Sequence, residues 1–217
     1  AVTTGIRNTL IGGLAGDALT DADYNVAVGM QSLSSDTLGS RSTALGFSAL
    51  ETQNFTTATD AYNVAVGYQA GNDITTGLRN NLLGGLAGDA LTDGNDNVAI
   101  GYQALTADTQ GDNSVAIGNN ALFSQNGTNG SVYNVAVGKN AGFAITTGTN
   151  NTIMGGLAGD ALTTGSFNVA LGVAALGADD LGSHAVAVGY GALESQNYAT
   201  ATNGYNTAVG SNAGYAV

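Results

Sequence analysis

The chain has 217 residues, of which 34 are glycine, and it contains no proline, cysteine or tryptophan. Its formal net charge is −12 at pH 7 with only four basic residues, which argues against binding to nucleic acid or to an anionic membrane. The lack of cysteine excludes disulfides and thiolate metal sites, and no run of about 20 apolar residues predicts membrane insertion in this segment.

A glycine-punctuated repeat runs along the whole chain, each copy being a version of Asn-x-Ala-aliphatic-Gly. The steps in sequence number between successive glycines are 17, 17, 21, 17, 17, 17, 20, 17, 17, 17 and 21. The repeating unit is therefore a coil of about 17 residues with a short insertion every fourth time, and such a period predicts a solenoid rather than a globular enzyme fold. The twelve glycines are Gly12, Gly29, Gly46, Gly67, Gly84, Gly101, Gly118, Gly138, Gly155, Gly172, Gly189 and Gly210.

A longer repeat contains four coils. The segment 12–20 returns letter for letter at 84–92 and at 155–163. These copies define three super-repeats of about 72 residues within a single predicted domain, 1–217. The chain opens and closes at the same phase of the repeat, without a polar capping coil. We therefore expect a segment of a longer fibre, or a subunit that stacks end to end.

A short strand is predicted before each punctuating glycine. The residue preceding the glycine is aliphatic in all twelve coils, the residue two places earlier is Val, Thr or Asn81, and the residue between them is Ala in nine coils. These residues alternate between two faces of a strand, so both faces are apolar and are expected to be buried. The absence of proline suits a continuous ladder of backbone hydrogen bonds between coils, because proline has no N–H group to donate.

A second stripe of small residues follows the glycine, because the third residue after it is Ala in eleven coils and Ser32 in the other. We predict two short strands per coil with a tight turn at the glycine. Our hypothesis for assembly is that the alanine face forms a subunit interface, since small side chains allow close approach.

The repeats at 113–121 and 133–141 resemble the head repeats of trimeric autotransporter adhesins of the YadA type, and similar repeats occur in bacteriophage tail fibres. The resemblance covers the whole chain. It implies an all-β, left-handed parallel β-roll, three chains side by side, and a long fibre on a cell or virion surface that binds a host protein or glycan.

Three insertions, at 51–62, 123–133 and 194–205, are the candidate recognition elements, because loops on a rigid scaffold often bind ligands. Aromatic rings beside amides suit sugars or proteins. The alternative is that the extra residues only bulge, with Tyr62, Tyr133 and Tyr205 covering one end of the core. The candidate surface-recognition residues are Gln53, Asn54, Phe55, Gln125, Asn126, Gln196, Asn197 and Tyr198.

An asparagine recurs four places before the glycine and predicts a structural ladder. Amides in register can hydrogen-bond along the axis and cap the turn backbone. The ladder residues are Asn8, Asn25, Asn63, Asn80, Asn97, Asn134, Asn151, Asn168 and Asn206.

Catalysis is not expected, since His184 is the only histidine, there is no cysteine, and the acidic residues form no paired constellation. The adjacent pair Asp179-Asp180 is predicted to be a solvated turn. The segment 12–19 superficially resembles a calcium-binding nonapeptide, but its third glycine is shifted by one place and its copies lie about 70 residues apart. No cofactor is therefore predicted, and calcium is kept only as an alternative.

The function that these patterns favour is a structural and adhesive extracellular fibre segment that associates with itself. The alternatives are a bacteriophage tail fibre, a self-assembling extracellular filament subunit and, with less support, an ice-binding solenoid. Ice binders usually present a regular threonine array, whereas here the threonines of the strands are interrupted by valines.

Overall fold

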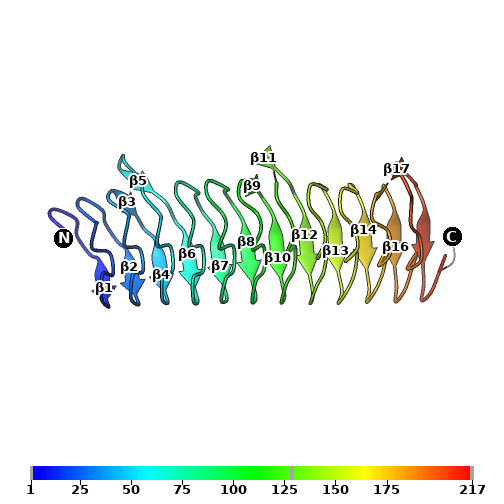
Figure 1. Cartoon of the computed structure of the whole chain (residues 1–217), viewed down its shortest axis with the longest axis horizontal. Coiled ribbons are helices and arrows are strands. Elements are labelled where there is room, and N and C mark those ends of the chain that lie inside the picture. Colours follow the sequence, from blue (N-terminus) through cyan, green and yellow to red (C-terminus); the bar gives the residue numbers. More distant parts are fainter. Residues whose placement is uncertain (1, 128–129, 216–217) are drawn as a thin grey trace.

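The computed structural model describes residues 2–127 and 130–215 and forms a β-solenoid whose coils stack along one axis (Figure 1). Each coil contributes one strand to a continuous twelve-stranded parallel sheet. Neighbouring strands pair in the same register, so that Ala116 pairs with Ala99 on one side and with Ala136 on the other. The predicted all-β parallel solenoid of about twelve coils is therefore confirmed.

The strands of the main sheet each have three residues. Three shorter parallel pairs, of two residues each, lie at the insertions. The main sheet contains β1 (Thr9–Ile11), β2 (Val26–Val28), β4 (Thr43–Leu45), β6 (Val64–Val66), β7 (Asn81–Leu83), β8 (Val98–Ile100), β10 (Val115–Ile117), β12 (Val135–Val137), β13 (Thr152–Met154), β14 (Val169–Leu171), β16 (Val186–Val188) and β18 (Thr207–Val209). The short pairs are β3 (Gly39–Ser40) with β5 (Thr59–Asp60), β9 (Gly111–Asp112) with β11 (Gly130–Ser131), and β15 (Gly182–Ser183) with β17 (Thr202–Asn203).

The two faces of the main sheet have different environments. In β8 the central Ala99 is fully buried inside the coil, whereas Val98 and Ile100 point outward and remain partly exposed. Ala104, in the second small-residue stripe, is also fully buried. The expectation that both faces of the strand are buried is therefore wrong. The alanine face cannot be a subunit interface, because both alanine stripes line the interior of the solenoid.

The turn after each strand explains why the coil is so uniform. The punctuating glycines have φ between +127° and +141°, a region that L side chains rarely adopt. The second and fourth residues that follow are left-handed too, as at Gln103 (φ +55°) and Leu105 (φ +57°) in the sixth coil. These left-handed residues bend the chain, so in the described residues the segment after the glycine is a turn. The prediction of a second strand there is wrong.

The core is filled differently in successive coils. In the coil of Gly84, Leu82 and Leu91 occupy the interior, and Gly88 leaves room for both, since a Cβ there would lie 2.8 Å from Leu82 Cδ2 and 3.0 Å from Leu91 Cδ1. In the next coil an alanine replaces the first leucine, Leu105 stands where the glycine was, and Asp108 replaces the second leucine. In these two coils large and small residues thus compensate one another, which keeps the interior filled.

Candidate functional site

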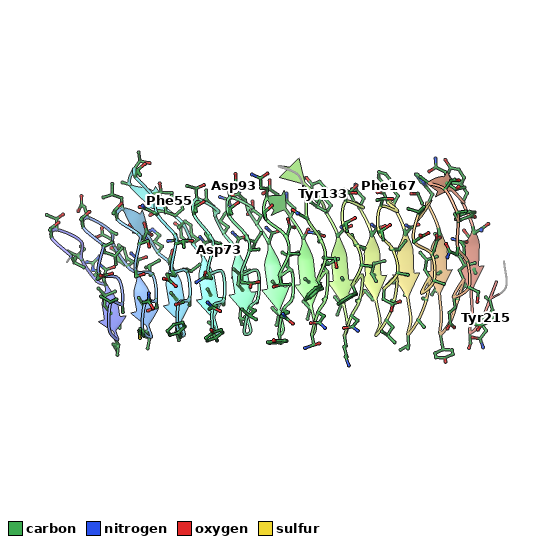
Figure 2. The ribbon with its side chains drawn as sticks, in the orientation of Figure 1. Phe55, Asp73, Asp93, Tyr133, Phe167 and Tyr215 are labelled. Carbon is green, nitrogen blue, oxygen red and sulfur yellow. The ribbon has the colours of Figure 1, made fainter. Side chains whose placement is uncertain are left out.

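The three insertions project from one edge of the solenoid and are separated by four coils each (Figure 1). We call residues 54–61, 126–132 and 197–204 the projecting loops, of which residues 128–129 lie outside the described part. The short pairs β3–β5, β9–β11 and β15–β17 tie each loop to the coil before it. Figure 2 shows Phe55 and Tyr133 along this edge. The loops are therefore extensions of a regular scaffold.

A buried aspartate anchors the base of the first loop. Asp36 Oδ1 accepts hydrogen bonds from the backbone N–H of Gly39, at 3.0 Å, and of Phe55, at 3.1 Å. Its second oxygen accepts from Gln53 Nε2 at 2.6 Å. Both side chains are fully buried. A carboxylate held by several donors can stay inside a core at an acceptable cost, so the base of the loop is fixed in place.

The second and third insertions use the same pair. Asp108 Oδ2 accepts from Gln125 Nε2 at 2.6 Å, and Asp179 Oδ2 accepts from Gln196 Nε2 at 2.5 Å. Burial raises the pKa of the Asp108 carboxyl above its ordinary value, an effect that the hydrogen bond from Gln125 and those from backbone N–H groups oppose. Asp179 is fully buried, so the prediction of a solvated turn at this residue is wrong.

The glutamines also join the asparagine ladder. The Oε1 atom of Gln125 accepts from Asn134 Nδ2 at 2.9 Å, and the equivalent bonds join Gln53 to Asn63 at 2.9 Å and Gln196 to Asn206 at 2.7 Å. The prediction that Gln53, Gln125 and Gln196 are surface-recognition residues is wrong, because their side chains are at most 2% exposed and form hydrogen bonds within the core.

Except for Asn206, whose amide donates to side chains, the ladder asparagines bond to backbone groups and not to one another's side chains. Asn97 is typical: its Oδ1 accepts from the backbone N–H of Ser114 at 2.9 Å, and its Nδ2 donates to the carbonyl of Gly111 at 2.7 Å. Asn8 and Asn206, in the first and last coils, are half-buried. The fully buried members are Asn25, Asn63, Asn80, Asn97, Asn134, Asn151 and Asn168.

The remaining predicted loop residues divide into exposed amides and packed rings. Asn54, Asn126 and Asn197 are exposed. Phe55 is only 6% exposed and packs against Gly39, where a Cβ would lie 2.7 Å from its ring. Tyr198 is half-buried, and its hydroxyl accepts from the ladder residue Asn206 at 3.0 Å. Among the predicted recognition residues, the three asparagines are therefore the ones accessible at the surface.

A column of residues, ten of them exposed and two half-buried, runs beside the projecting loops five places before each glycine, and we call it the corner column. All twelve residues have φ between +51° and +64°. Their exposed surface is polar or aromatic, and Phe167 lies on the same edge as the loops (Figure 2). The members are Arg7, Tyr24, Arg41, Tyr62, Arg79, Asp96, Asn113, Tyr133, Asn150, Phe167, His184 and Tyr205.

Neighbours in the corner column contact one another through rings and guanidinium groups. The guanidinium of Arg41 lies 4.9 Å from the ring centre of Tyr24 and pairs with Asp60 at 2.9 Å. Near the other end, the His184 ring stacks on Phe167, with centroids 5.1 Å apart. Because these rings stack along the axis, their faces are covered by each other, and they do not form a flat platform for a sugar. Sequence inspection did not identify this column, although each member lies at a constant distance from its glycine.

The outward residues of the main sheet form the second surface of interest, which we call the aliphatic face. It runs along all twelve strands and is mainly apolar, and side chains such as Leu83 (39% exposed) and Met154 (45% exposed) project from it. The face consists of Thr9, Ile11, Val26, Val28, Thr43, Leu45, Val64, Val66, Asn81, Leu83, Val98, Ile100, Val115, Ile117, Val135, Val137, Thr152, Met154, Val169, Leu171, Val186, Val188, Thr207 and Val209.

Exposed large side chains continue the aliphatic face past the strand ends, at the residue after the punctuating glycine. Phe47 and Tyr68 stack there with centroids 5.5 Å apart, and Tyr102 and Tyr190 are more than half exposed. Scattered apolar residues are normal on a protein surface, whereas a largely apolar area of this length is unusual on a soluble monomer.

The acidic residues do not gather into a cation site within the described residues, where no group of three or more His, Asp or Glu side chains is placed to hold a metal ion. Asp17, Asp89 and Asp160, the aspartates of the calcium-like segment, occupy equivalent turns four coils apart. A groove of about 300 Å³ passes over Gly177 between Asp160 and Glu194. Two carboxylates separated by a glycine do not by themselves make a site.

Within the described part of the chain, no helix has the length and apolar character needed to cross a membrane. Comparison of the chain with family models, with curated proteins and with solved structures found no match.

Proposed function

We propose that this chain is a structural and adhesive segment of an extracellular fibre, in which the stacked coils provide length and stiffness and the projecting loops provide attachment. The observation that carries this proposal is the combination of an uninterrupted twelve-stranded ladder with loops anchored every fourth coil. With coils about 4.8 Å apart, successive loops stand roughly 19 Å apart on one edge, a spacing suited to multivalent contact with a surface.

The loops support the adhesive part of the proposal. Their bases are held by buried aspartates, so an exposed residue such as Asn54 or Asn126 is presented in a fixed position. Preorganised loops lose little conformational entropy on binding, which favours affinity for a host protein or glycan. The chain's net charge of −12 favours a neutral or basic partner and opposes binding to nucleic acid.

The aliphatic face supports self-association, as a side-by-side homotrimer or a related parallel assembly. Twelve strands about 4.8 Å apart give a face about 53 Å long, and with a width of about 15 Å its area is roughly 800 Å². A stable protein interface buries about this area on each partner. A second copy is the best occupant, because its side chains repeat with the same axial spacing and can interdigitate along the whole length.

The mass of the purified chain in solution is the first test. We expect an assembly of a few chains by sedimentation, and a shift to monomer in Leu83→Asp, because an unpaired carboxylate on the face opposes burial. Asn126→Asp, which adds the same charge to a projecting loop, should leave the mass unchanged. A wild-type monomer at micromolar concentration would overturn the proposed assembly.

Attachment is tested separately with a variant that lacks residues 56–59 and 199–202, which returns both coils to the length of their uninterrupted neighbours. We expect at least a tenfold loss of binding to coated matrix proteins or immobilised glycans, with no change in the number of chains per assembly. Equal binding by the shortened variant would show that the first and third projecting loops are not the adhesive element. Failure of the wild type to bind any such surface would overturn the adhesive role.

A further inference from the structure

Asn81 is the only carboxamide among the outward residues of the twelve-stranded sheet, all of which belong to the described part of the chain. It is the first residue of β7 and lies between Val64 and Val98 of the neighbouring strands, with Leu83 beside it. Its side chain is exposed. A polar amide therefore stands within the aliphatic face, nearer its middle than its ends.

The fold of the single chain does not explain this residue. The backbone N–H of Asn81 donates to Asn97 O at 2.8 Å, but no described group bonds its side chain. The preceding ladder residue, Asn80, is buried and bonded at both ends of its amide. Asparagine is also disfavoured in strands.

The repeat itself departs from its pattern here. The equivalent positions in the other two super-repeats are Thr9 and Thr152, whose methyl and hydroxyl groups are tolerated both in strands and beside valine. A coil built on the repeat alone would carry Thr or Val at position 81. Asn81 thus marks one level of a solenoid whose levels are otherwise closely similar.

Such similarity creates a register problem for any assembly through this face. Moving one copy along another by a single coil brings valine opposite valine again at many levels, and a shift of four coils reproduces the super-repeat. Apolar contact alone would therefore permit several registers. An amide buried against valine, in contrast, would be left without hydrogen-bond partners, which disfavours the slipped registers.

We propose that Asn81 sets the register of copies that assemble through the aliphatic face, by hydrogen-bonding to Asn81 of the neighbouring copies at the same level. A carboxamide has both a donor and an acceptor, so identical amides can satisfy one another. Single polar residues in apolar interfaces of coiled coils specify register in the same way, at some cost in affinity. The inference rests on the proposed self-association.

Disulfide trapping tests the register, and the chain's lack of native cysteine makes introduced thiols unambiguous. Val98→Cys and Val135→Cys lie on the same column two coils apart, and they are prepared as separately tagged chains that are mixed during assembly. Two coils correspond to roughly 10 Å. Because a disulfide needs Cα atoms within about 7 Å, copies in register join like with like, and a mixed disulfide reports a slipped register.

With Asn81 present we expect like-with-like disulfides and almost none of the mixed kind. In an Asn81→Val background we expect assembly to persist or strengthen, and the ratio of mixed to like disulfides to rise at least about fivefold, which corresponds to about 1 kcal/mol. Asn81→Gln, which keeps an amide, should lie closer to the wild type than Asn81→Val does. Valine favours strands, so loss of folding is not expected.

Equal mixed fractions in the Asn81 and Asn81→Val backgrounds would overturn the proposal, as would an assembled wild type without like-with-like disulfides. Failure of the underlying assembly is distinguishable, because it would appear as a monomeric mass in every variant before any disulfide is formed.

Discussion

Replacing Gly84 by alanine should destabilise the solenoid strongly, whereas the same change at the adjacent Gly85 should not. A Cβ on Gly84 would lie 2.4 Å from the carbonyl oxygen of Gly101 and 2.6 Å from its carbon, and φ at Gly84 is +140°. At Gly85 the nearest atom to an added Cβ is Cδ2 of the Tyr102 ring at 3.6 Å, an ordinary contact. The two substitutions therefore differ only in backbone conformation and in the space available.

The expected magnitude follows from two contributions. Holding alanine in a glycine-only conformation costs about 1–3 kcal/mol. Pushing the next coil away costs a further 1–3 kcal/mol or so, because the parallel ladder holds that carbonyl in place. Gly84→Ala should therefore lower the free energy of unfolding by about 4 kcal/mol, whereas Gly85→Ala should change it by less than about 1 kcal/mol and can raise it by restricting the unfolded chain.

Urea unfolding followed by circular dichroism and by tyrosine fluorescence measures the difference. With a slope of about 3 kcal/mol per molar, a loss of about 4 kcal/mol moves the midpoint down by more than about 1 M. Two probes are needed, because coils can separate in sections in a stacked repeat. Equal midpoints for Gly84→Ala and Gly85→Ala would refute the view that coil spacing at the glycine limits the fold.

Gln125→Ala should lower the free energy of unfolding by about 2–4 kcal/mol in thermal or urea unfolding, because it leaves the buried carboxylate of Asp108 short of a donor. The control Asn126→Ala, in the exposed loop, should change the free energy of unfolding by less than about 0.5 kcal/mol. Burial raises the pKa of Asp108, so its carboxyl group stays protonated to higher pH in the folded chain than in the unfolded chain. The contribution of this carboxyl group to folding stability is therefore complete below about pH 3.8 and is lost as the pH rises through the raised pKa. Urea midpoints measured from about pH 3 to 7 should thus fall less steeply in Asp108→Asn than in the wild type, and identical slopes would contradict this reasoning. Leu82→Ala, inside the coil, should lower the free energy of unfolding by about 2–5 kcal/mol. Leu83→Ala, on the aliphatic face, should mainly weaken self-association measured by sedimentation. The reverse result would mean that the inward and outward faces of the strand have been interchanged.

Much of the fold could be read from the spacing of the glycines. A constant period, an aliphatic residue before each glycine and the absence of proline predicted parallel strands in equivalent positions, and residues such as Ala99 and Ala116 pair accordingly. Which face of the strand points inward could not be read from polarity, because both faces are apolar. The answer depended on volume: the interior is narrow and also receives Leu105 from across the coil, so only alanine fits beside it.

The buried pair at the insertions was missed because each residue was interpreted by its local surroundings. Gln125 stands next to exposed Asn126 in an insertion, which suggests a loop surface. The useful signal was the column seven places after the glycine, where Leu91 and Ile145 are fully buried and where Asp108 and Gln125 take the equivalent positions. Reading residues along the solenoid axis rather than along the chain would have placed both side chains inside.

The alternating core also limits how such a chain can lengthen or shorten. Removing the coil of Gln125 alone would leave Asp108 without its partner, and removing the coil of Gly84 alone would take away Leu82, whose side chain packs beside Gly71 of the preceding coil. A block of four coils contains a complete set of matched cross-sections and joins to its own copy without a mismatch. Gain or loss of coils by recombination should therefore proceed in whole blocks, so that solenoids of this type differ in length by steps of roughly 19 Å.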